Sequence, residues 1–100
     1  MPVYDSLTPT LILDAIESAG FRCDGRLIAL NSYENRVYQA WLDDGSALVA
    51  KFYRPARWSD AAIREEHELA MELAQAELPV VAPIVRGSTL FEHASFRFAL

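Results

Sequence analysis

The chain has 100 residues, 52% of them hydrophobic, which is enough for one small domain with a single core. Fourteen acidic residues outnumber nine basic ones, and the formal net charge of −5 opposes attraction to nucleic acid or to an anionic membrane. No apolar run approaches the ~20 residues that span a bilayer, and the N-terminus has no signal-peptide pattern, so we expect a cytoplasmic protein without nucleic-acid or membrane partners.

The first predicted element is a short amphipathic helix. Thr8 can cap it, Pro9 suits its first position, and apolar residues then recur at helical spacing until Gly20. Three strands are predicted next, because β-forming residues dominate the segments 27–30, 37–42 and 47–53. Asp43-Asp44-Gly45 predicts a tight turn between the last two strands, since Asp-Gly readily adopts positive φ angles.

The longest predicted helix follows, from Ser59 to about Leu78. Ser59 is a favourable N-cap residue, and the Ala, Glu and Leu content of the segment favours helix. Two prolines end the helical pattern, after which residues 84–86 are predicted as a fourth strand. This order of elements indicates an α+β domain with an antiparallel sheet, one principal packed helix and an N-terminal helix.

Residues 89–100 predict a final hairpin-like pair that turns around Glu92–Ser95. Phe96, Phe98 and Leu100 alternate as in a strand and continue to the last residue without a polar cap. We therefore expect the core to continue in sequence that is absent from this chain.

Lys51 is the first candidate functional residue. It lies within the apolar strand at 47–53, where a charged ammonium needs a partner, an exposed edge or a ligand. Glu66 is the second, because helical spacing places it in the middle of an apolar stripe made by Ala62, Ile63, Leu69, Ala70 and Leu73. Each residue alone is more simply explained as semi-exposed, but together they suggest a strand lysine oriented by a helix glutamate, the pair that kinase-fold enzymes use to hold ATP phosphates. Glu65 is the alternative partner.

The turn at 31–35, Asn-Ser-Tyr-Glu-Asn, joins the first two predicted strands. In a kinase-like lobe such a turn lies over the nucleotide phosphates, where backbone N–H groups and a hydroxyl can bind them. It contains no glycine, so by itself it is also explained as a polar hairpin loop. Cys23 is the only cysteine, and the two histidines are scattered, so we expect no intramolecular disulfide and no metal site.

These features resemble the bacterial stress response kinase A family, Ser/Thr protein kinases with an aminoglycoside-phosphotransferase-like fold. The resemblance covers about residues 7 to 100 and is carried by LNSYENRVYQ at 30–39, VAKFYRP at 49–55, Trp58, EEH at 65–67 and LPVVAP at 78–83. It implies that Ser32, Lys51 and Glu66 contact or orient ATP. It also implies Mg²⁺ as cofactor and a protein hydroxyl as acceptor.

The family's catalytic aspartate and magnesium ligands belong to a C-terminal lobe that has no counterpart here. We therefore expect residues 1–100 to be the nucleotide-binding lobe, with the missing lobe of the same polypeptide as its partner, no catalytic residue of its own and no kinase activity in isolation. Two alternatives remain. One is a small-molecule kinase of the same fold, acting on an aminoglycoside, choline or homoserine-like alcohol, and the other is a non-catalytic interaction domain whose exposed apolar edge pairs with a partner.

Overall fold

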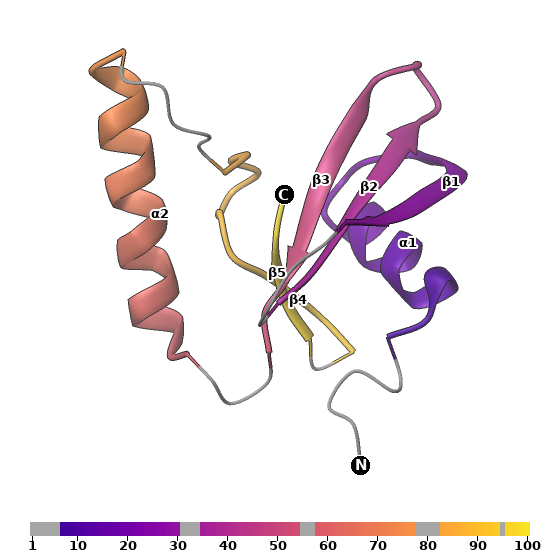
Figure 1. The fold of residues 1–100 in the computed structure, drawn as a ribbon, viewed down its shortest axis with the longest axis horizontal. Helices are drawn as coiled ribbons and strands as arrows, with labels where there is room; N and C mark the ends of the chain where they lie inside the picture. The colour runs from indigo at the N-terminus through magenta and orange to yellow at the C-terminus, as the bar shows by residue number, and fades with distance from the viewer. Residues whose placement is uncertain (1–6, 31–34, 55–57, 78–82, 95) are drawn as a thin grey trace.

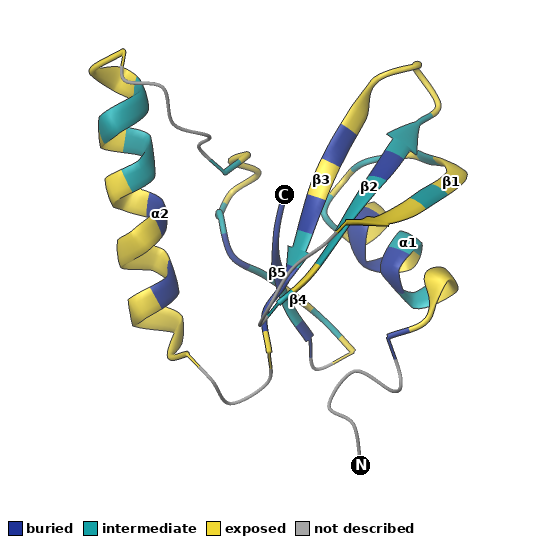
Figure 2. Ribbon diagram, in the orientation of Figure 1, coloured by how far each residue is buried: buried dark blue, intermediate teal, exposed yellow. Residues whose placement is uncertain are grey.

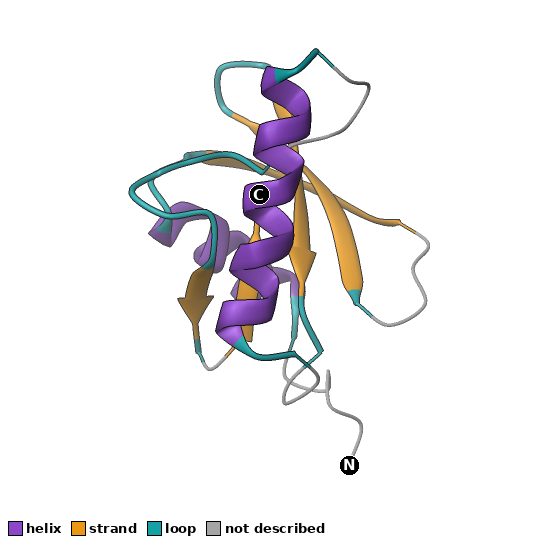
Figure 3. Ribbon diagram, turned by 90° about the vertical axis from the view of Figure 1, so that its left-hand side faces the viewer, coloured by secondary structure: helices purple, strands orange, loops and turns teal. Residues whose placement is uncertain are grey.

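The computed structural model describes residues 7–30, 35–54, 58–77, 83–94 and 96–100. In this part of the chain the elements are α1 (Pro9–Ser18), β1 (Cys23–Leu30), β2 (Arg36–Leu42), β3 (Ala47–Phe52), α2 (Asp60–Gln75), β4 (Phe91–His93) and β5 (Phe96–Ala99). The strands form one antiparallel sheet in the order β1-β2-β3-β5-β4, and the helices lie on opposite sides of its central strands (Figures 1 and 3). The predicted α+β class is confirmed, and a five-stranded antiparallel sheet with two helices is consistent with the expected kinase-like N-terminal lobe.

The predicted helix starts and the central hairpin are also confirmed. The Thr8 hydroxyl accepts a hydrogen bond from the Leu11 N–H at 3.2 Å, and the Ser59 hydroxyl accepts one from Ala62 at 3.1 Å. Between β2 and β3, Gly45 has a φ of 90°, and its N–H bonds the Leu42 carbonyl at 3.1 Å. A side chain at this φ would be strained, so glycine sets the turn.

Strand β1 begins at Cys23, four residues before the predicted start at Leu27. Its pairing with β2 is irregular between these two residues, and Gly25 in between has a φ of 101°. By composition, the segment Asp24-Gly25-Arg26 is typical of a loop. In the structure it is an irregular stretch of strand, which is common where glycine occurs within a strand.

The predicted strand at 84–86 is wrong. These residues form a loop whose side chains are exposed, and Ile84 makes a single backbone bond to Leu100 at 2.7 Å. From Phe96 to Phe98 this edge of β5 is already paired with β4, so the loop meets the sheet only beyond the end of that pairing. The fourth strand is instead Phe91–His93, which forms the predicted C-terminal hairpin with β5.

The main core lies between α1 and one face of the sheet (Figure 2). Because strand residues alternate between faces, Leu48, Ala50 and Phe52 point into this core, where Ile12 and Ile16 of α1 are almost fully buried. The Phe52 and Phe98 rings stack with their centres 5.1 Å apart. This packing fixes β3 at the centre of the sheet and directs Val49, Lys51 and Tyr53 to the opposite face.

Helix α2 is attached on that opposite face by fewer buried side chains than α1. Only Ile63 and His67 of its sixteen residues are buried, and Ile63 joins a small cluster with Tyr53, Leu90 and Ala99. His67 is 5% exposed and lies within hydrogen-bonding distance of the hydroxyls of Tyr53 and Thr89. A polar residue therefore occupies a core position of the longest helix.

The burial of His67 predicts a pH-dependent stability. Burial lowers the pKa of His67, the nearby Glu66 carboxylate raises it by less, and Lys51 lowers it slightly further, so folding favours the neutral imidazole. This contribution to the free energy of unfolding should be complete above the ordinary histidine pKa of about 6.5 and be lost as the pH falls below it. Urea unfolding across this pH window should show a steeper loss of stability on acidification for the wild type than for His67→Gln. If the stability of both proteins fell equally with pH, the pH dependence would not come from His67.

Candidate functional site

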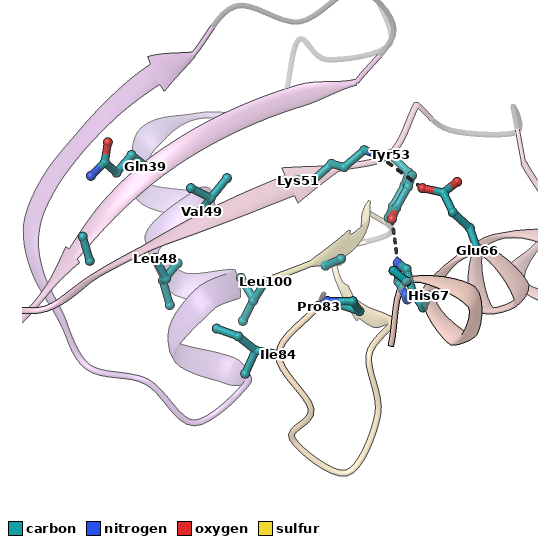
Figure 4. A pocket seen from close by; sticks show the side chains of 13 residues that line it. Gln39, Leu48, Val49, Lys51, Tyr53, Glu66, His67, Pro83, Ile84 and Leu100 are labelled. Carbon is teal, nitrogen blue, oxygen red and sulfur yellow. Dashed lines mark hydrogen bonds and ion pairs between the residues drawn. The ribbon is translucent and has the colours of Figure 1, made fainter. Parts of the chain in front are cut away.

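A cavity of about 410 Å³ lies between the exposed face of β3 and helix α2 (Figure 4). Its polar lining residues are Gln39, Lys51, Tyr53, Glu66 and His67. The rest of its lining is apolar and comes from β3, α2, the loop before β4 and the end of the chain: Ala47, Leu48, Val49, Ala70, Pro83, Ile84, Ala99 and Leu100. The cavity therefore has broad apolar walls, with its charged groups gathered at one end.

Lys51 lies at that charged end, as the sequence predicted for a strand lysine in need of a partner. Its side chain is 38% exposed, and its Nζ lies 4.0 Å from Oε1 of Glu66. The same Nζ is 5.3 Å from the centre of the Tyr53 ring, which is close enough for a cation–π contact. Lys51 is thus held among an acid and an aromatic face while it remains accessible from solvent.

Glu66 is the carboxylate that reaches Lys51, but its predicted place on the helix was wrong. Its side chain is 70% exposed, and Leu69 of the predicted stripe is 55% exposed. The buried positions are Ile63 and His67, four residues apart, so the buried face of α2 is rotated away from the predicted stripe and Glu66 lies at its edge. Glu65, the alternative partner, is exposed and lines neither cavity formed by the described residues.

A second cavity, of about 270 Å³, opens next to the same ion pair. It shares Lys51, Tyr53 and Glu66 with the first cavity and adds Asn35, Trp58, Ala62 and Ile63. Asn35 ends the 31–35 turn, and its Oδ1 accepts a hydrogen bond from the Arg54 N–H at 3.2 Å. This bond fixes Asn35 beside the residues that follow β3. Ser32, predicted from the same turn, lies outside the described residues.

The Tyr53–His67 contact is a feature of the site that the sequence reasoning missed. The Tyr53 hydroxyl is 2.8 Å from Nε2 of His67, and the Thr89 hydroxyl is 2.7 Å from Nδ1 (Figure 4 shows the first pair). Burial raises the pKa of Tyr53 to about 12, with a further increase from Glu66, so its hydroxyl stays protonated at neutral pH. Loss of the imidazole would leave two hydroxyls unpaired, at a cost of about 1–3 kcal/mol each where they are buried.

The arrangement suits an elongated ligand with a flat apolar part and an anionic part. Apolar walls can enclose the first part, while Lys51, between the two cavities, supplies a point charge for the second. In the part of the chain that the structure describes, no group of three His, Cys, Asp or Glu residues is arranged to bind a metal ion. Neither helix of the described residues has the length and apolar composition of a membrane-spanning segment.

Comparison with known proteins identifies the type of chain that carries this site. Residues 26–100 match the phosphotransferase enzyme family. The stress response kinase A of Salmonella choleraesuis strain SC-B67 is 48% identical to this chain over 98 residues, and that of Escherichia coli strain K12 is 47% identical over the same length. A serine/threonine protein kinase called RdoA, from Salmonella typhimurium strain LT2, is also 47% identical over 98 residues.

Each of these alignments includes 97% of this chain but only 30% of the relative, so the chain spans less than a third of the length of the curated relatives that it matches. The family match itself covers β2, β3 and α2 entirely, and with them the Lys51–Glu66 pair and both cavities' charged residues. This chain belongs to the phosphotransferase enzyme family and is homologous to the stress response kinases.

Proposed function

We propose that this chain is the ATP-binding lobe of a Ser/Thr protein kinase that works in the cytoplasm, in a bacterial stress response. The observation that carries the proposal is the position of Lys51, which pairs with Glu66 and lies between a largely apolar cavity and a smaller one with a mixed polar and apolar lining. The protein acceptor is suggested by the name of the RdoA relative, a serine/threonine protein kinase.

In this proposal the adenine ring occupies the apolar part of the larger cavity, against Val49 and Ile84, and Lys51 binds the phosphates. Glu66 keeps the lysine from turning into solvent. Ser32, in the turn that ends at Asn35, supplies a hydroxyl and backbone N–H groups to the phosphate oxygens. The cation thus counters the negative charge of the phosphoryl group during transfer.

The reaction itself needs groups from outside this chain. The bond between the γ-phosphorus and its bridging oxygen breaks as the acceptor hydroxyl oxygen binds phosphorus, and the hydroxyl proton passes to a base. In this proposal both the metal ligands and the base belong to a C-terminal lobe; the described residues of this chain contain no group of three His, Cys, Asp or Glu side chains arranged around a metal ion. Lys51 and Glu66 bind and orient in this scheme, and neither acts as the base.

Replacing Lys51 tests the central assignment. In the full-length protein, Lys51→Ala should lower kcat/KM for phosphotransfer by about 100-fold or more, because a fixed charge that stabilises the transition state is removed. The side chain is half-exposed and outside both core clusters, so the melting temperature should change little. Unchanged phosphotransfer would count against the ATP site.

A matched pair of substitutions tests which glutamate serves the lysine. Glu66→Gln should lower activity about fivefold, since an exposed ion pair contributes about 1 kcal/mol or less, whereas Glu65→Gln should leave activity within twofold of wild type. Both variants keep the shape of the side chain and remove one charge from α2. A larger effect at Glu65 would identify it as the partner.

The chain in isolation provides the third test. Purified residues 1–100 should show no Mg²⁺-dependent turnover of ATP, because the base and the metal ligands are assigned elsewhere. Phosphate release or autophosphorylation measured with radiolabelled ATP would reveal any activity. Turnover that disappears in Lys51→Ala would require a catalytic group within this chain and would overturn the two-lobe scheme.

A further inference from the structure

Two neighbouring contacts join the same two segments of the protein, the end of β3 and the middle of α2. Lys51 and Tyr53 are two residues apart, so they project on the same side of the extended chain. Glu66 and His67 are consecutive on the helix. Lys51 contacts Glu66, and Tyr53 contacts His67 (Figure 4). The ion pair and the buried hydrogen bond are therefore adjacent contacts between the same strand and the same helix.

The two contacts differ in how firmly they can fix the helix. The ion pair is 4.0 Å long, and its glutamate is 70% exposed, so water and salt compete with it and it constrains the helix weakly. The Tyr53–His67 bond is 2.8 Å long between two residues that are 3% and 5% exposed. A short bond shielded from water fixes direction and distance more strictly than an exposed pair of flexible charged side chains.

The partners of His67 also suit a fixed position. A neutral imidazole has one N–H donor and one acceptor nitrogen, and the hydroxyls of Tyr53 and Thr89 can each donate or accept. Both ring nitrogens are therefore satisfied in either tautomer. The imidazole joins three segments, because Tyr53 follows β3, His67 belongs to α2, and Thr89 precedes β4.

Elsewhere α2 is held mainly near its start. Arg97 of β5 donates to Asp60 at 2.7 Å, and Ile63 packs in the small cluster with Tyr53 and Leu90. Beyond His67 no residue of α2 is buried. The imidazole is therefore the last buried anchor along the helix, and it directly follows the glutamate that must face Lys51.

We propose that His67 and the Tyr53 hydroxyl are positioning residues, which hold α2 so that Glu66 stays beside Lys51. The catalytic consequence rests on the proposed ATP site, whereas the structural part does not. Neither residue touches the reacting phosphoryl group in this scheme, and both act through Glu66. Removing the bond should loosen α2 and reduce the benefit that Glu66 gives to the lysine.

Tyr53→Phe is the sharpest variant, because it removes one hydroxyl and keeps the ring that packs against Lys51 and Ile63. Tyr38→Phe is the matched control, since Tyr38 lies on β2 with its ring against Phe52 in the other core. Amide hydrogen exchange of the full-length protein should become at least threefold faster in α2 for Tyr53→Phe only. Equal exchange in wild type and Tyr53→Phe would overturn the proposal whether or not ATP binds.

Kinetics then test whether the bond acts through Glu66. Tyr53→Phe should lower kcat/KM for phosphotransfer about three- to fivefold in the wild-type background, which is no more than Glu66→Gln itself, but less than twofold in the Glu66→Gln background. Equal losses in both backgrounds would show that the hydroxyl does not act through Glu66. If even the wild type neither binds nor uses ATP, the proposed function fails while the exchange experiment still decides the structural part.

Substitutions at His67 provide an independent measurement. His67→Gln retains a side chain that can bond the Tyr53 hydroxyl, whereas His67→Leu fills similar space without any polar atom. The Gln variant should recover most of the slow α2 exchange that the Leu variant loses. If the two exchange alike, the hydrogen bond does not hold the helix, and burial alone accounts for the residue.

Discussion

The alternation of side chains along β3 is the constraint on which the rest of the structure depends. Leu48, Ala50 and Phe52 enter the core on the α1 side, and this burial fixes the rotation of the strand about its own axis. Every second residue is then obliged to face α2, which is how a lysine comes to lie on a rigid surface. A shift of one residue in strand register would bury Lys51 and expose Phe52, so the hydrophobic core and the charged site are specified by the same pairing.

The opposite face of the sheet is built differently from the core. It is half-open, with Val49 48% exposed and Ile28 48% exposed, and its helix is attached by a few contacts around Tyr53. Such a face loses little hydrophobic packing when a ligand enters, and it gains apolar burial in return. The stable α1 side thus serves as a support for a recognition surface on the α2 side.

Much of this could be predicted from local sequence signals. Capping residues at Thr8 and Ser59 and the Asp-Gly turn located the helix starts and the central hairpin, because each depends on its own few residues. The errors arose where tertiary contacts decide. The segment 84–86 has strand-like composition, but β4 already occupies the neighbouring edge of β5. The buried face of α2 follows an imidazole whose polar partners are 14 and 22 residues away in sequence. The available signal for the Tyr53–His67 contact was its spacing in sequence, because Tyr53 lies two residues after Lys51 and His67 directly follows Glu66.

Helix α2 is attached unevenly, because its buried residues lie in its first half. These buried residues can act as a pivot, and the residues beyond His67 form an arm without buried side chains. Ile63 and His67 mark the pivot, and Glu66 lies between them, whereas Ala70 on the wall of the larger cavity belongs to the arm beyond. At about 1.5 Å of rise per residue, Gln75 lies about 12 Å along the axis from His67, so a small tilt displaces the arm much more than the glutamate. A tilt of α2 about this pivot would therefore change the width of the cavity at Ala70 more than it would change the Lys51–Glu66 contact.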